Sequence, residues 1–116
     1  HPASLALCSM LLLSACTPHP GSGEWKAVAD NEAGFSRIEV HYNGRADIYN
    51  ATAETAILRC FWGGMSPRQI ALDCVVASDT DISKSYHLTV MQDDSAELTG
   101  SDQQLIATFS RQPRSE

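Results

Sequence analysis

The histidines and carboxylates of this chain are the side chains that could carry acid–base catalysis or bind a metal. His41 and His87 fall on the polar side of segments in which apolar and polar residues alternate, so we expect both on the outer faces of strands, exposed to solvent. General acid–base catalysis needs groups within hydrogen-bond reach of one reacting atom. No segment such as a Gly-x-Ser-x-Gly elbow indicates a nucleophile beside a base. We predict no catalytic residues and no enzymatic activity.

Metal binding has equally little support in the residue spacing. The aspartates at 79, 81, 93 and 94 fall in expected loops, where their oxygens could bind calcium weakly. They lack the regular ligand spacing and the glycine of an EF-hand, and aspartate is common in turns for its backbone hydrogen bonds. Cys60 and Cys74 lack the close spacing and neighbouring histidines of a zinc site. We predict no metal site and no bound cofactor.

The strongest candidate for binding is the segment 59–68, "RCFWGGMSPR". Phe61 falls on the polar side of its expected strand, and Met65 is expected in a glycine-rich loop at the tip of a hairpin. Arg59 and Arg68 flank them. An exposed aromatic side chain with arginines nearby is typical of the residues that dominate protein–protein binding energy. In the alternative interpretation, Phe61 and Met65 close one end of a barrel.

The elements that must position these residues follow from period-two alternation of apolar and polar residues after residue 22. Asn43 and Gly44 are expected to form a type I′ turn, which needs positive φ at both positions, with Tyr42 on the apolar face. Eight strands result, an all-β pattern typical of a small antiparallel up-and-down β-barrel or a flattened sandwich. The expected strand segments are 23–29, two within 36–51, 55–62, 69–76, 86–91, 96–100 and 104–111.

Length and charge limit the possible partners. The 116 residues suffice for one domain, and the net charge of −6 comes entirely from residues after Cys16. Binding to nucleic acid or anionic lipid needs several lysines or arginines on one face. No basic cluster of that kind is present, so we predict no nucleic-acid partner.

The beginning of the chain carries the most specific motif. Residues 3–15 are apolar but shorter than the roughly 20 residues that span a bilayer, and they are typical of a signal peptide. Leu13-Ser14-Ala15-Cys16 resembles the lipobox of bacterial lipoproteins. The resemblance implies cleavage before Cys16, a diacylglycerol thioether on its sulfur and acylation of the new amino terminus. Thr17, rather than aspartate, implies sorting to the outer membrane, facing the periplasm. The alternative is a buried helix of the domain.

This resemblance divides the chain into four parts. Residues 1–15 are expected to be a signal peptide, clipped at its start because a basic beginning and an initiator methionine are missing. Residues 16–23 are expected to be the lipid anchor and a flexible tether rich in proline and glycine. Residues 24–112 form the β-barrel domain, and residues 113–116 a polar tail.

The resemblance also assigns the four cysteines. Cys8 leaves with the signal peptide and Cys16 carries lipid, so Cys60 and Cys74 are expected to form a disulfide in the oxidising periplasm. Strand register agrees with this pairing. If Cys60 faces Cys74, then Leu58 faces Val76 and Trp62 faces Leu72, and all these residues lie on the apolar face.

We therefore expect a membrane-anchored periplasmic lipoprotein whose barrel binds a protein, either an envelope protein or an incoming one, in inhibition, immunity or envelope assembly. C-type lysozyme inhibitors are similar in size and architecture, but their cysteine-containing first strand and loop motif are missing from this sequence. The alternative is a lipocalin-like carrier of a small apolar ligand inside the barrel.

Overall fold

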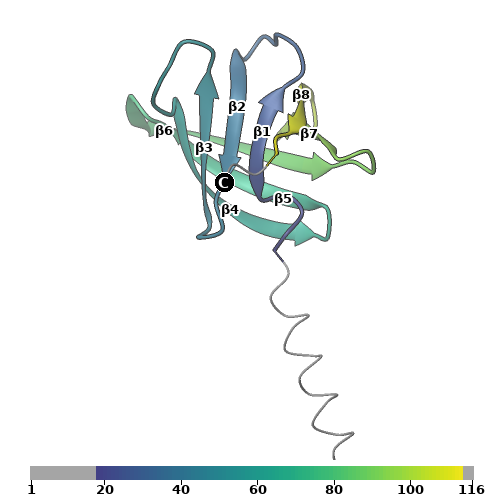
Figure 1. Cartoon of the computed structure of the whole chain (residues 1–116). Helices are drawn as coiled ribbons and strands as arrows, with labels where there is room; N and C mark the ends of the chain where they lie inside the picture. Colours follow the sequence, from purple (N-terminus) through teal and green to yellow (C-terminus); the bar gives the residue numbers. More distant parts are fainter. Residues whose placement is uncertain (1–17, 114–116) are drawn as a thin grey trace, which may run out of the picture.

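A computed structural model describes residues 18–113; the expected signal peptide, Cys16 and the end of the polar tail lie outside the described residues. Eight antiparallel strands close into a barrel, in which each strand pairs with the next and β8 pairs with β1 (Figure 1). The predicted all-β barrel is confirmed. No helix in the described part is long and apolar enough to cross a membrane. The strands are β1 (Gly23–Ala27), β2 (Phe35–Val40), β3 (Arg45–Asn50), β4 (Leu58–Ser66), β5 (Gln69–Val76), β6 (Asp79–Val90), β7 (Ser95–Gly100) and β8 (Leu105–Arg111).

The inward residues of the alternating pattern fill the barrel. Burying a large apolar side chain contributes about 1.5 to 3 kcal/mol, and an eight-stranded barrel is just wide enough for its own side chains. The strands therefore enclose a packed core. Its largest fully buried side chains are Trp25, Phe109, Ile38, Ile48, Ile70, Leu72, Leu88 and Leu98.

The β4–β5 hairpin has the predicted register. Cys60 pairs with Cys74 and the two form a disulfide bond. The expected glycine-rich loop is wrong, however, because β4 continues to Ser66 and the turn is only Pro67–Arg68. Gly64 lies in β4 rather than in a turn, and a Cβ at this position would make a tight 3.2 Å contact with the His19 ring.

The β2–β3 turn also differs from the prediction. Gly44 has a positive φ of 88°, but Asn43 does not, so the turn is not type I′. The observed register pairs Val40 with Ala46, which keeps apolar residues of both strands inside. A type I′ turn centred on Asn43 and Gly44 would shift this register by one residue. Tyr42 accordingly lies in the turn, 65% exposed, instead of on the apolar face.

Residues 18–23 are the described part of the expected tether; Gly23 begins β1, and residues 19–22 are hydrogen-bonded to the barrel. His19 Nε2 donates to the Ser66 carbonyl at 2.8 Å, and the Gly21 N–H donates to His19 Nδ1 at 2.9 Å. The buried Trp25 indole donates to the Gly21 carbonyl. Arg111 donates to the carbonyls of Pro20 and Ser22. The abundance of proline and glycine suggested slack, whereas these residues instead allow close packing on the core.

The residues around this segment define one end of the barrel, which we call the N-terminal end. It comprises residues 18–22 and the turns at 41–44, 67–68 and 91–94. Contacts join these parts: the Arg68 guanidinium donates to the Met91 carbonyl, and the Arg111 guanidinium pairs with Asp94 at 2.9 Å. Figure 1 shows the described chain beginning at this end, below β1 and at the same end as the β2–β3 turn and the β4–β5 turn.

We predict that the disulfide is a major source of stability. In the chain-entropy model, closing a loop with a sequence separation of 14 residues contributes about 3 kcal/mol. The double variant Cys60→Ala/Cys74→Ala should therefore melt at least about 12 °C lower than the oxidised protein. Differential scanning calorimetry of both proteins measures this difference. Equal melting temperatures would contradict the prediction.

Two glycine substitutions should separate backbone strain from side-chain space. A Cβ at Gly44 or at Gly63 meets no atom within 4 Å, but only Gly44 has positive φ. Gly44→Ala should lower the free energy of unfolding by about 1 to 2 kcal/mol, whereas the matched control Gly63→Ala should be neutral or slightly stabilising. Urea denaturation measures both, and equal losses would show that the turn does not impose this φ.

Candidate functional site

An exposed aromatic side chain lies on the outer wall of β3–β5. Phe61 is 65% exposed, and the strand register places it between Arg45 and Asp73. The Arg45 guanidinium lies 5.5 Å from the centre of the Phe61 ring. A depression is formed here by His41, Asn43 and Cys60 together with a group that we call the Phe61 patch: Arg45, Asp47, Arg59, Phe61 and Val75.

The backbone of the Phe61 patch is held from both sides. The disulfide partner Cys60 immediately precedes Phe61, and Trp62 follows it. The Trp62 N–H donates to the Gly44 carbonyl at 2.9 Å, and its indole donates to the His41 carbonyl at 2.7 Å. A contact residue that is already fixed in place loses less conformational freedom on binding.

The structure brings together only two of the four predicted binding residues. Arg59 and Phe61 belong to the Phe61 patch. Met65 lies further along β4 and is 54% exposed. Arg68 is in the β4–β5 turn and donates to the carbonyls of Val90 and Met91, so it joins two turns. The alternative in which Phe61 and Met65 close the barrel is wrong, because both are exposed.

Arg45 and Asp47 were missed by sequence reasoning. Both are on β3, where Arg45 pairs with Phe61 of β4 and Asp47 pairs with Arg59 of β4. The segment 51–57 between β3 and β4 contains no turn motif that sets the register. The usable signal was Ala46, a small residue that faces the interior and pairs with Cys60. This pairing places Arg45 opposite Phe61 and Asp47 opposite Arg59.

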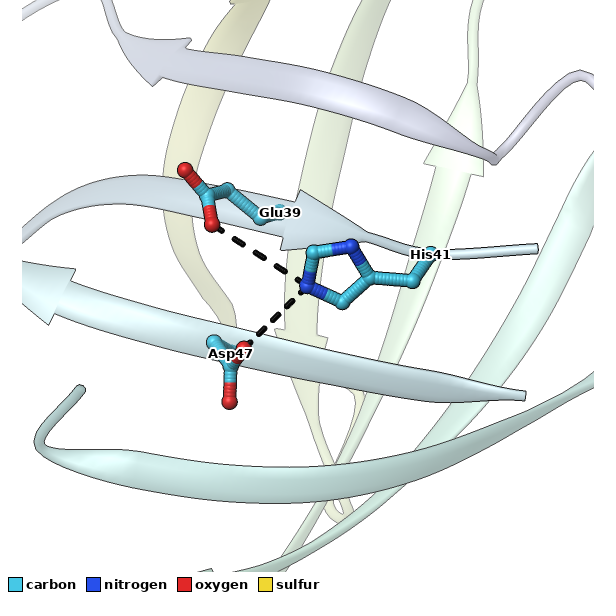
Figure 2. Close-up of side chains that lie close together, drawn as sticks. All are labelled: Glu39, His41 and Asp47. Atoms are coloured by element: carbon cyan, nitrogen blue, oxygen red, sulfur yellow. Dashed lines mark hydrogen bonds and ion pairs between the residues drawn. The ribbon is translucent and has the colours of Figure 1, made fainter. Parts of the chain in front are cut away.

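A second polar cluster lies on the outer wall at β2, the following turn and β3 (Figure 2). Glu39 and Asp47 face each other across the two strands. Carboxylates in such positions repel. His41 Nε2 lies between them, 3.2 Å from Asp47 Oδ2 and 4.0 Å from Glu39 Oε1. The hydrogen bond between this nitrogen and Asp47 offsets part of that repulsion.

This cluster has the ligand types that a divalent metal ion uses, with donor atoms all within 4.8 Å of one another. Its carboxylates already have partners, however. Arg37 Nε lies 3.4 Å from Glu39 Oε2, and the Tyr49 hydroxyl donates to Glu39 Oε1. Burial, together with the charges of Glu39 and Asp47, raises the pKa of Tyr49, which keeps this hydroxyl protonated. We interpret the cluster as a surface charge network.

The remaining candidates have structural roles. His41 is exposed as predicted, but it follows β2 instead of lying in a strand. The prediction that His87 is exposed is wrong, because this residue of β6 is half-buried. The Asp81 N–H donates to Asp79 Oδ1, and the Ser95 N–H and hydroxyl donate to Asp93 Oδ1. The Ser95 bonds lower the pKa of the Asp93 carboxyl. Asp93 lies in a turn, where aspartate commonly makes such bonds. The prediction of a loop at Asp79 and Asp81 is wrong, because β6 begins at Asp79 and contains both residues.

Comparisons with known proteins identify no relative of this chain. No protein-family model matches the chain, and no curated protein or solved structure matches it either.

Proposed function

We propose that this protein is a lipid-anchored protein of the bacterial envelope whose barrel binds a protein partner through the Phe61 patch. One observation carries the binding proposal: a phenylalanine that is 65% exposed stands next to a disulfide on a closed barrel. Exposing this ring to water costs free energy that burial in a partner would recover.

The composition of the patch supports a protein partner. Aromatic residues and arginine are enriched at the centres of protein interfaces, and the patch combines Phe61 with Arg45, Arg59 and the oppositely charged Asp47. The Phe61 patch lies where β4 is paired on both sides: Phe61 pairs with Arg45 of β3 and Asp73 of β5. Recognition at the patch would therefore use side chains rather than a free strand edge.

The packed interior argues against the lipocalin-like alternative. A carrier needs an internal cavity, but Trp25, Leu72 and Phe109 are among the large side chains that fill the interior of this barrel. The partner classes that fit the proposal are those expected from the sequence: an enzyme that the barrel inhibits, an incoming protein, or a component of envelope assembly.

The anchoring part of the proposal is supported by the sequence. Leu13-Ser14-Ala15-Cys16 implies lipid on Cys16, and Thr17 implies the inner leaflet of the outer membrane, facing the periplasm. Two or three acyl chains are needed for stable attachment, because a single chain gives only marginal binding.

We expect Cys16→Ser to release the protein from membranes. The wild-type protein, expressed from a complete lipoprotein precursor, should fractionate with membranes, because its acyl chains insert into the bilayer. The variant should appear in the soluble periplasmic fraction or keep its signal peptide. Immunoblots of the two fractions measure this, with Cys8→Ser as the matched control. If Cys16→Ser stays in the membrane fraction with the wild-type mature mass, Cys16 is not the anchor.

A photo-crosslinking amino acid at position 61 should capture a discrete protein partner in intact cells. Leu105 provides the matched control, since it is 54% exposed but lies where β8 begins, opposite the N-terminal end. With the captured partner purified, Phe61→Ala should weaken its binding about tenfold or more, and Leu105→Ala less than about twofold. C-type lysozyme is a defined first partner for the same titration.

Two results would contradict the binding proposal. One is the absence of any protein-specific crosslink at position 61. The other is equal loss of affinity in Phe61→Ala and Leu105→Ala, which would mean that the partner does not use the patch.

A further inference from the structure

The distance between the expected lipid and the barrel is short. Pro18 is the first described residue, and residues 19–22 are bonded to the barrel through His19, Trp25 and Arg111. Cys16 precedes Pro18 by two residues, a chain length of at most about 7 Å. We propose that the N-terminal end of the barrel rests against the bilayer that holds Cys16. This inference depends on the proposed lipidation.

The side chains exposed at the N-terminal end fit a membrane interface. Tyr42 is 65% exposed in the β2–β3 turn, Met65 54% exposed before the β4–β5 turn, and Met91 37% exposed after β6. Tyrosine is enriched at membrane interfaces, where its ring and hydroxyl suit the boundary between lipid and water. Methionine adapts its shape to irregular apolar surroundings.

The arginines at this end are already engaged by the protein, whereas Asp93 and Asp94 of the turn at 91–94 are exposed. Arg68 donates to two backbone carbonyls, and Arg111 pairs with Asp94. The net charge of −6 gives the barrel no electrostatic attraction to anionic lipid. Apolar contact alone would be weak in solution, but a short tether makes the contact intramolecular and so raises its effective concentration.

This orientation would decide what the Phe61 patch can reach. The five residues of the patch lie on the strands of the side wall, and the depression that they form borders the turn at 41–44 through His41 and Asn43. With the N-terminal end on the bilayer, these strands stay in the aqueous space close to the lipid surface. A partner would therefore be bound beside the barrel at a fixed, small height above the membrane.

Paramagnetic NMR of the lipidated full-length mature protein tests the contact. The protein is inserted into nanodiscs of phosphatidylethanolamine and phosphatidylglycerol that contain a headgroup spin-labelled lipid. We expect amide signals of residues 41–44 and 91–94 to be attenuated several-fold more than those of the loops at 28–34 and 51–57, which lie at the opposite end. Both ends are read in one sample.

The matched variant inserts a flexible Gly-Ser linker of about ten residues between Thr17 and Pro18. It keeps the lipid and the folded barrel, but we expect it to attenuate the two ends nearly equally. Equal attenuation in the wild type overturns the orientation while leaving the anchor intact, and so does unchanged attenuation in the linker variant. Attenuation of the N-terminal end only when another envelope protein is added would mean that a protein covers this end. Failure of the wild type to enter nanodiscs overturns the anchor and this inference together.

Discussion

Closure of the sheet is the constraint on which the other features of this structure depend. β1 must reach β8, and at this seam Trp25 pairs with Arg111. The Arg111 guanidinium lies 4.3 Å from the centre of the Trp25 ring and also bonds to Asp94 and to carbonyls of residues 20 and 22. One side chain thereby joins the first strand, the last strand and the segment that precedes the barrel. A closed sheet leaves its outer wall as the place for recognition.

Alternation of residue types was enough to predict the class of fold and much of its core. The register of β4 and β5 followed from the cysteines, because Cys60 and Cys74 both lie on apolar faces. Once these two residues face each other, the neighbouring residue pairs of the two antiparallel strands are determined. The turns were less predictable. Asn43-Gly44 is a strong local turn signal, but the inward pairing of Val40 with Ala46 overrides it. Tertiary burial determined the register, and local propensity did not.

The features missed in the sequence depend on contacts between distant segments. Proline and glycine before β1 indicate slack in isolation, and only the fold shows His19 bonded to Ser66 and Gly21 packed against Ile70. Arg45 and Phe61 likewise meet through the pairing of β3 with β4, which no turn motif specifies. Two of the five residues of the Phe61 patch were therefore predicted: Arg59 and Phe61 of β4 were identified, and the β3 residues and Val75 of β5 were not.

The barrel and the segment before β1 form one hydrogen-bonded unit, so the Phe61 patch keeps a fixed relation to the chain that leads to Cys16. Backbone relaxation of Gly21 and Ser22 in the soluble domain tests this claim most directly. Both amides lie in the segment held by His19 and Arg111. The account predicts order parameters of about 0.85, equal to those of the strands, and values below about 0.6 would contradict it.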